Sequence, residues 1–327
     1  GKRRQYNMDK DFRIVFMGTP EFAVTILDKL HKEGIAIKGV VTAPDKKAGR
    51  GRKINQSAVK EYAVENDLNV LQPANLKDAD FLSELKNLGA DLFVVVAFRM
   101  LPEIVWSMPS KGTINLHASL LPNYRGAAPI NWAIINGEKE SGVSTFFIEK
   151  EIDTGEIIEQ EKASIGENET VGELYKRLMN IGADTMLSTV HKIQSGQVMS
   201  INQDKFIDAA HKPAPKIFKE DCKINFTNTI QEVHNFCRGL APYPGAWCTL
   251  YNREKSESKT FKIFRTLKTS ISTDESKVLK SDSEGILIPC SDYFIRVLEI
   301  QSEGKRKMNY KDFLAGNSVD NLTVIDA

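Results

Sequence analysis

The chain has 327 residues, of which 44 are Lys or Arg and 43 are Asp or Glu, so its formal net charge is +1. The hydrophobic fraction of 41% and the charged fraction of 27% are close to globular averages, which excludes a disordered or collagen-like chain. The length predicts two domains or one large one. The small net charge argues against a nucleic-acid-binding protein that works through overall basicity, but not against local basic patches.

The first half of the chain alternates strands and helices. Phe12–Met17 is rich in β formers, Gly18-Thr19-Pro20 ends it, a helical pattern runs to Gly34, and Ile35–Val41 follows as a strand. This β-α-β opening favours a parallel sheet. Further helices are predicted at Ser57–Asn66, Asp78–Leu88 and Thr170–Ser195, and further strands at Asp91–Ala97, Gly112–His117 and Val143–Ile148. Residues 12–205 therefore predict an α/β domain with a Rossmann-like, mostly parallel sheet.

The pattern changes after the proline-rich break Lys212–Pro215. One helix is predicted at Thr229–Cys237. Short strands follow at Ala246–Tyr251, Thr260–Phe264, Gly285–Cys290 and Tyr293–Ile300. Several short strands separated by turn residues predict a small β-barrel or sandwich, here over residues 206–327.

Basic residues cluster in two places. Five of the eight residues from Lys46 to Lys53 are basic, and between Pro213 and Ser270 ten Lys and Arg face five Asp and Glu. A solvated loop and a solvated domain surface are the simple interpretation. One basic region on each predicted domain also favours a shared polyanionic ligand.

Several familiar motifs are missing. The first βα turn holds only Gly18, so the G-x-G-x-x-G dinucleotide fingerprint is absent, as are a phosphate-binding P-loop, an HExxH helix and a GxSxG elbow. The four cysteines, at positions 222, 237, 248 and 290, form no CxxC pair and fit no zinc spacing. We therefore expect free thiols in a reducing cytosol and no metal site. No apolar run reaches the ~18 residues of a membrane span.

Asn115 and His117 are the best candidates for chemistry. A spacing of two places both side chains on one face of a strand, at the carboxyl end where α/β sheets bind ligands. An amide N–H can donate to a developing oxyanion, and an imidazole can carry a proton near neutral pH. Asp153, in a loop after the next strand, can orient the ring. From the residues alone, a structural His and an ordinary Asp-Thr-Gly turn remain equally good explanations.

The stretch Asn115–Gly126 resembles the N-x-H-x-S-L-L-P-x-x-R-G signature of the folate-dependent formyltransferases. Asp153-Thr154-Gly155 is similar to the D-T-G of that family, and Phe12–Ala23 and Val94–Pro102 resemble its opening strand and folate-side loop. Pro44–Lys53 is similar to an insertion found in the branch that acts on methionyl-tRNA. Arg238–Leu240 and Pro242–Trp247 resemble the second domain of that branch. Arg99 departs from the family, in which this position is often small.

The resemblance implies a reaction and a site. The donor would be 10-formyltetrahydrofolate and the acceptor the α-amino group of initiator methionyl-tRNA, giving N-formylmethionyl-tRNA for translation initiation. Asn115 would hold the oxyanion, His117 would stabilise its charge and move protons, and Asp153 would orient His117. The implied folate-site residues are Phe98, Arg99, Met100, Leu101, Ser119, Leu120, Leu121 and Pro122.

The resemblance also implies a tRNA-binding surface and an OB-like barrel for the second domain. Its expected tRNA contacts are Lys46, Lys47, Arg50, Arg52, Lys53, Lys216, Lys219 and Lys223, and Arg238 is a further candidate phosphate contact. We expect a monomer in the bacterial cytoplasm, with an organellar origin as the weaker alternative. The alternative acceptor is a nucleotide-sugar or another small amine, for which the basic regions have no evident use. A binding protein with a lost active site is the third possibility.

Overall fold

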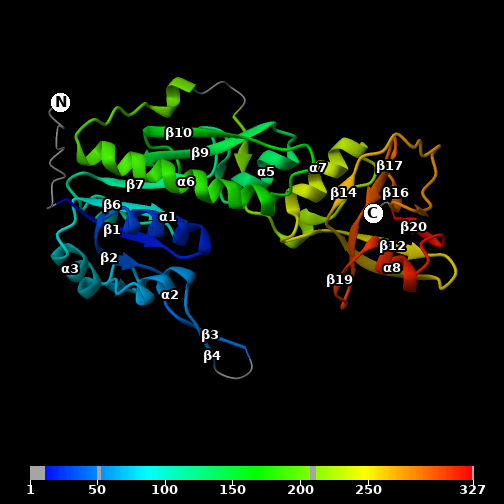
Figure 1. Cartoon of the computed structure of the whole chain (residues 1–327), viewed down its shortest axis with the longest axis horizontal. Coiled ribbons are helices and arrows are strands. Elements are labelled where there is room, and N and C mark those ends of the chain that lie inside the picture. The colour runs from blue at the N-terminus through cyan, green and yellow to red at the C-terminus, as the bar shows by residue number, and fades with distance from the viewer. Residues whose placement is uncertain (1–11, 50–52, 207–210, 326–327) are drawn as a thin grey trace. The chain divides into compact units, whose positions relative to one another are not determined.

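The structure is a computed structural model that describes residues 12–49, 53–206 and 211–325 (Figure 1). These residues form two compact units, and each unit gathers several stretches of the chain. Unit 1 holds the described residues of Gly1–Arg125, Gly142–Lys162 and Arg177–Lys212, and unit 2 holds those of Gly126–Ser141, Ala163–Lys176 and Pro213–Ala327.

Unit 1 is built on a seven-stranded sheet in the order β10-β9-β7-β6-β1-β2-β5. The pairs β1–β2, β1–β6, β2–β5 and β6–β7 are parallel, and β7–β9 is antiparallel. The predicted α/β class with a mostly parallel, Rossmann-like sheet is confirmed. The strands are β1 (Arg13–Gly18), β2 (Ala36–Val41), β5 (Val70–Leu71), β6 (Leu92–Val96), β7 (Thr113–His117), β9 (Glu140–Phe147) and β10 (Ile157–Ser164).

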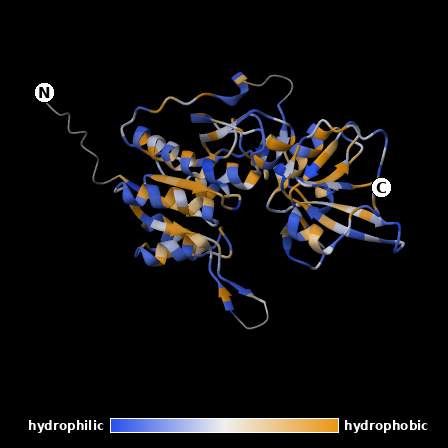
Figure 2. Ribbon diagram, turned by 45° about the vertical axis from the view of Figure 1, so that its right-hand side comes forward, coloured by the Kyte–Doolittle hydropathy of each residue, from blue (hydrophilic) through white to orange (hydrophobic). Residues whose placement is uncertain are grey.

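Helices cover both faces of this sheet, and its strands are largely hydrophobic (Figure 2). On one face, Leu85 of α3 belongs to the same buried cluster as Val15 of β1. On the other face, Gly182 of α6 lies against Leu116 of β7 and Ile26 of α1, so close that a Cβ would be 2.7 Å from the Leu116 side chain. The helices are α1 (Glu21–Lys32), α2 (Ala58–Glu65), α3 (Ala79–Asn87), α4 (Glu103–Trp106) and α6 (Val171–Gln194).

The helix starts that the sequence predicted have a local cause. The Ser57 side chain accepts a hydrogen bond from the Lys60 backbone N–H at 3.0 Å, and the Asp78 carboxylate accepts one from the Phe81 N–H at 3.0 Å. Each cap satisfies a backbone donor that the helix itself leaves unpaired. Strand β10 was not predicted, because most of its side chains are polar and only partly buried.

Unit 2 contains two sheets, in the orders β19-β18-β13-β12-β20 and β14-β17-β16-β15. The second β domain that the sequence predicted is therefore present. The strands are β12 (Ala246–Asn252), β13 (Glu257–Ile263), β14 (Thr266–Leu267), β15 (Lys280–Asp282), β16 (Gly285–Pro289), β17 (Phe294–Val297), β18 (Glu299–Ser302), β19 (Lys307–Asn309) and β20 (Leu322–Val324). The helices are α5 (Pro129–Ile135), α7 (Ile230–Leu240) and α8 (Tyr310–Gly316), and a two-residue strand β11 (Pro213–Ala214) precedes α7.

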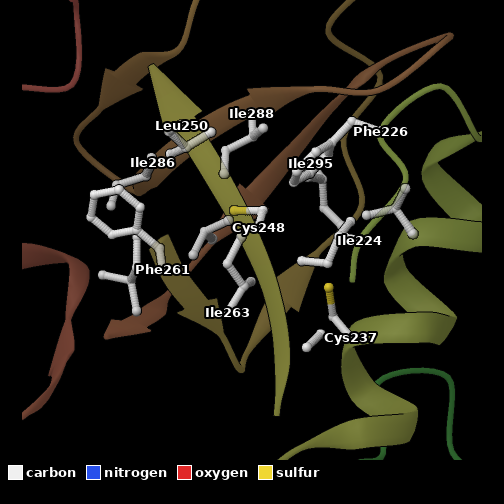
Figure 3. Packing of buried hydrophobic residues seen from close by; sticks show 14 of the residues in the cluster. Ile224, Phe226, Cys237, Cys248, Leu250, Phe261, Ile263, Ile286, Ile288 and Ile295 are labelled. Atoms are coloured by element: carbon white, nitrogen blue, oxygen red, sulfur yellow. The ribbon is translucent and has the colours of Figure 1, made fainter. Parts of the chain in front are cut away.

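The core of unit 2 joins both sheets to helix α7. Figure 3 shows Cys237 of α7 facing a cluster that includes Cys248 of β12, Ile263 of β13 and Ile288 of β16. All four side chains are buried. Burial of apolar area on this scale is the main favourable contribution to folding of the unit. No helix in the described part of the chain has the length and apolar character that a membrane crossing needs.

Helix α7 also carries buried polar side chains. His234 is 1% exposed, its Nε2 lies 3.2 Å from the Glu167 carbonyl and its Nδ1 lies 2.7 Å from Thr266 Oγ1. A carbonyl can only accept, so Nε2 carries the hydrogen and Nδ1 accepts from the Thr266 hydroxyl. Burial, the largest cause, lowers the pKa of His234 from 6.5 to about 4. The ring is therefore neutral at physiological pH.

This low pKa predicts acid sensitivity of the fold. The unfolded chain binds a proton at His234 near pH 6.5, and the folded chain does so only near pH 4. The site therefore lowers the free energy of unfolding as the pH falls from 6.5 to about 4. Between pH 7.5 and pH 5 we expect the site to lower the free energy of unfolding by about 2 kcal/mol. His234→Gln should reduce this loss, measured by urea unfolding at both pH values. The matched control His191→Gln removes an exposed imidazole and should behave like the wild type. Equal pH dependence in both variants would contradict the prediction.

Candidate active site

Asn115 and His117 lie on one face of β7. Strand register places Asn115 beside Val95 of β6, whose side chain belongs to the cluster on the α3 face of the sheet. The intervening Leu116 faces α6 on the opposite side. Side chains alternate along a strand, so both Asn115 and His117 project to the α3 face, as their spacing predicted. His117 is the last residue of the strand.

The His117 ring has a partner at each nitrogen. Its Nε2 lies 2.7 Å from the Tyr124 carbonyl oxygen, and because that oxygen can only accept, Nε2 carries the hydrogen. Its Nδ1 lies 3.7 Å from Oδ2 of Asp153. The side chains of His117 and Asp153 are each 9% exposed, so solvent screens this pair little. The Nδ1 atom is therefore the ring nitrogen without a hydrogen, and it faces a carboxylate.

Asp153 reaches His117 by an indirect path. Strand β9 is antiparallel to β7, so its last residue, Phe147, lies opposite Ile114 near the start of β7, whereas His117 is at the end. The loop between β9 and β10 must therefore turn back toward His117. Asp153 has φ +57°, a left-handed conformation that few residues other than glycine adopt. The sequence predicted a carboxylate in this loop but carried no signal for the return path.

Asn115 is unusual among the buried polar groups. Its Oδ1 atom is buried and has no hydrogen-bond partner. Within the described ranges, every other buried side-chain nitrogen or oxygen atom has one. An unpaired buried acceptor costs about 1–3 kcal/mol of stability. Such a group is rare in native structures, and a role in catalysis or the binding of a water or ion explains it. The fold therefore does not use the acceptor oxygen of Asn115 for a hydrogen bond.

The segment Ser119–Pro122 is fixed mainly through its backbone. The Ser144 hydroxyl donates to the Ser119 carbonyl at 2.7 Å and accepts from the Leu121 N–H at 3.2 Å. Gln160 Nε2 donates to the Leu121 carbonyl at 2.9 Å. Leu121 and Pro122 are buried and Leu120 is half-buried. Ser144 and Gln160 are supporting residues that sequence reasoning missed, because they lie on β9 and β10, outside the recognised motif.

The loop after β6 begins with Ala97 in a left-handed conformation, φ +50°. Arg99 donates to the Pro73 carbonyl at 2.5 Å and to the Ala74 carbonyl at 3.0 Å, and its guanidinium carbon lies 5.2 Å from the Phe98 ring centre. Arg99 therefore joins this loop to the one that follows β5. Met100 is 66% exposed, whereas Leu101 is buried in the cluster beneath it.

Three residues in these site loops, Ala97, Tyr124 and Asp153, have positive φ angles although none is glycine. Each such conformation costs of order 1–3 kcal/mol and persists only where the surroundings enforce it. Their presence in the three loops around His117 indicates that the loops are held in place by tertiary contacts. Strain of this kind concentrates at functional sites.

The predicted basic loop forms an antiparallel hairpin of β3 (Lys46–Ala48) and β4 (Lys53–Asn55), which extends away from the sheet of unit 1 (Figure 1). Strand register places Lys46 and Lys53 on one face and Lys47 with the exposed Ile54 on the other. All three lysines are exposed. At the base, Asp45 accepts hydrogen bonds from Lys60 and Gln72, which lower the pKa of its carboxyl group. Arg50 and Arg52 lie outside the described residues.

In unit 2, two expected tRNA-contacting lysines lie beside aromatic rings. Lys216 Nζ is 5.4 Å from the Phe218 ring centre, and Lys223 Nζ is 5.7 Å from that of Trp247. The exposed Lys219 offers its carbonyl to the Trp247 indole N–H at 2.7 Å. Cations interleaved with aromatic rings suit a nucleic-acid surface.

Arg238 was expected to contact phosphate, and the structure corrects this expectation. The side chain is 6% exposed, donating to the Gly166 and Glu169 carbonyls and to Asn235 Oδ1. Its charge is therefore used inside unit 2, where burial lowers the pKa of the guanidinium. Helical spacing places Arg238 on the same face of α7 as His234, but only the structure shows that this face is buried.

The four cysteines are free and buried in unit 2. Burial raises the pKa of Cys248 and that of Cys290 to about 12, so both thiols stay protonated and unreactive. In the described part of the chain, no group of three or more His, Cys, Asp or Glu side chains could hold a metal ion.

Comparison with known proteins matches most of the chain. The family model for formyl transferase matches residues 12–190, and the model for its C-terminal domain matches residues 216–318. A methionyl-tRNA formyltransferase from Flavobacterium johnsoniae is 51% identical over 306 residues, which is 93% of this chain and 96% of the relative. One from Bacteroides fragilis is 47% identical over 310 residues, 94% and 95% of the two chains.

Among solved structures, an N-formyltransferase from Helicobacter canadensis, solved in complex with folinic acid and dTDP-3-aminofucose, has a TM-score of 0.64 and 22% identity, covering 91% of this chain and all of that one. At this identity the likeness shows a shared fold. The two family models and the relatives near 50% identity, which are covered almost completely, go further. This chain belongs to the formyl transferase family.

Proposed function

We propose that this protein transfers the formyl group of 10-formyltetrahydrofolate to the α-amino group of methionine on initiator tRNA. The observation that carries the proposal is the buried His117–Asp153 pair at the end of β7, beside an Asn115 oxygen that the fold leaves unpaired. Relatives that match nearly the whole chain at 46–51% identity are named methionyl-tRNA formyltransferase. The donor agrees with the folinic acid bound by the Helicobacter canadensis enzyme.

The reaction forms one bond and breaks one. The free amine attacks the formyl carbon and gives a tetrahedral intermediate, which collapses as the bond from that carbon to N10 of the folate breaks. The amine loses one proton and N10 gains one, so atoms and charge balance. No oxidant, reductant or covalent enzyme intermediate is required, which fits a site whose proposed catalytic side chains are an imidazole, a carboxylate and an amide.

The three side chains suit these steps. The Asn115 amide N–H would donate to the oxygen of the intermediate, as in an oxyanion hole. His117 Nδ1 would take the proton that the amine releases, since Nε2 already donates to the Tyr124 carbonyl. Asp153 would orient the ring, stabilise its cationic form and assist proton transfer through an ordered water. The 3.7 Å separation is an ion-pair distance, and such contacts often tighten when substrate binds.

The folate would bind where the loops after β6 and β7 meet at the carboxyl edge of the sheet. The proposed contacts are Phe98, Arg99, Met100, Leu101, Ser119, Leu120, Leu121 and Pro122. Supporting this, both loops begin or end at strained, well-anchored backbone, which keeps a binding surface rigid. Arg99 would act by fixing the Phe98 loop, because its N–H groups already donate to two carbonyls of a neighbouring loop.

The tRNA would bind to the basic residues of both units. Lys46, Lys47 and Lys53 on the β3–β4 hairpin, with Arg50 and Arg52 in the same segment, would contact acceptor-stem phosphates. Lys216, Lys219 and Lys223 would bind a further part of the tRNA.

We propose the division into a catalytic domain, residues 12–205, and an OB-like tRNA-binding domain, residues 206–327. The two sheets around one core support a barrel of this type. A monomer in the cytoplasm, where tRNA is charged, stays a prediction.

The test offers the purified protein two acceptors. With 10-formyltetrahydrofolate as donor, we expect rapid formylation of methionyl-tRNA and none of a dTDP-linked amino sugar, measured by acid-gel separation of the tRNA and by mass spectrometry of the sugar. His117→Ala should lower the transfer rate by about 10²–10⁴-fold while tRNA binding is kept, because the proton acceptor is lost. His191→Ala, which removes an exposed imidazole, is the control. Transfer to the sugar alone would overturn the proposal in favour of the small-amine alternative.

Asn115 and Asn235 provide a matched pair for separating function from stability. Asn115→Leu removes an unpaired acceptor and should leave the free energy of unfolding unchanged or higher, while transfer falls about 10²-fold or more. Asn235→Leu removes the acceptor of Arg238 and should destabilise the protein by about 1–3 kcal/mol. Urea unfolding and single-turnover kinetics of both variants check this. A strongly destabilised Asn115→Leu protein would show that the residue is structural.

The basic hairpin can be tested by charge removal. Replacing Lys46, Lys47 and Lys53 by Ala should raise the KM for tRNA about tenfold or more and leave the KM for folate unchanged, because only phosphate contacts are lost. The salt dependence of tRNA binding should become shallower. A control that replaces the exposed Lys38, Lys86 and Lys111 removes the same charge elsewhere on unit 1. The hairpin assignment fails if both triple variants lose tRNA affinity equally.

A further inference from the structure

Gln203 is a buried amide that contacts the loop carrying Asp153. It is 1% exposed and lies in a short 3-10 turn, Gln203–Phe206, fifty residues after Asp153 in the chain. Its Nε2 donates to the Asp153 carbonyl at 2.8 Å and to the Gly155 carbonyl at 2.7 Å. These two bonds use both hydrogens of the amide nitrogen.

The other end of the same amide is also held. Arg125 donates to Gln203 Oε1 from Nη2 at 2.8 Å and from Nε at 3.2 Å. The guanidinium fixes which end of the amide faces the loop, since only the oxygen can accept from it. Gln203 is therefore fully hydrogen-bonded, in contrast to Asn115, and its orientation is determined.

The two carbonyls that Gln203 binds belong to Asp153 and Gly155, whose backbone is closely constrained. Asp153 has φ +57°, and Gly155 packs so closely that a Cβ there would be 1.5 Å from the Phe147 carbonyl oxygen. Strand pairing holds the loop only at its ends, where the Phe147 N–H donates to the Glu156 carbonyl at 3.0 Å. The path back to His117 leaves that pairing. Gln203 supplies two bonds at the point where the loop has turned back.

We propose that Gln203 is a positioning residue for formyl transfer: its amide holds the Asp153 backbone so that the carboxylate stays beside His117 Nδ1. It does not touch the reacting atoms and acts only through Asp153. This inference rests on the proposed function. Loss of the two Gln203 hydrogen bonds would have a large effect on the rate, because displacement of a catalytic group by about 1 Å can lower the rate about 10²-fold.

Two substitutions test the proposal. Gln203→Glu keeps the shape and the acceptor for Arg125 but cannot donate to the two carbonyls, and Gln203→Met removes both contacts without adding charge. We expect each to lower kcat about 10–100-fold, with the KM values for folate and tRNA changed less than about threefold. Gln197→Glu and Gln197→Met, at an exposed glutamine nearby, should match the wild type.

A double-mutant cycle separates positioning from a general structural role. In an Asp153→Asn background, measured by single turnover at high enzyme concentration, a further Gln203 substitution should change the rate less than about twofold, because the residue acts through Asp153. The same loss in both backgrounds would overturn the proposal, as would wild-type kcat in the Gln203 variants or a failure of both to fold by circular dichroism. If the wild-type protein itself does not formylate methionyl-tRNA, the proposed function fails instead.

Discussion

The imidazole of His117 is held at both nitrogens, by one contact from its own loop and one from a distant loop. The Nε2 contact is local, because Tyr124 follows His117 by seven residues in the same loop. The Nδ1 contact is distant, because Asp153 comes from a loop that leaves the sheet at the other end of β7. Fixing the first contact assigns the ring hydrogen to Nε2, and fixing the second gives the free nitrogen a carboxylate neighbour. The proposed proton transfer at Nδ1 depends on both contacts.

Polar contacts in the site fall into two groups with different roles. Gln160, Ser144 and Gln203 are hydrogen-bonded to backbone carbonyls and hold loops in conformations that include left-handed residues. Asn115 Oδ1 is left unpaired in the same region. A fold that satisfies its supporting amides and leaves one amide oxygen without a partner gives up stability at that position. In the proposed reaction, this loss of stability is offset by an amide that can donate to the substrate.

The net charge of the chain does not describe how its charged residues are distributed. The net charge of +1 averages a basic hairpin and a basic stretch of unit 2 against acidic residues elsewhere. Within the basic stretch, the location of each residue decides its role. Lys216 and Lys223 lie beside aromatic rings, whereas Arg238 is buried and binds backbone carbonyls. A count of lysines and arginines cannot make this distinction, because it carries no information on burial.

The sequence alone determined the features that depend on near neighbours in the chain. Apolar runs rich in β formers located most strands, helical spacing of apolar residues located the longer helices, and a spacing of two placed Asn115 and His117 on one face of β7. The tertiary structure alone decided that β9 is antiparallel, that its loop returns to His117, and that Gln203 binds that loop. It also decided that Arg238 is buried. Periodicity reports which face of an element is apolar but not which element covers it, so it does not show which residues far apart in the chain come into contact.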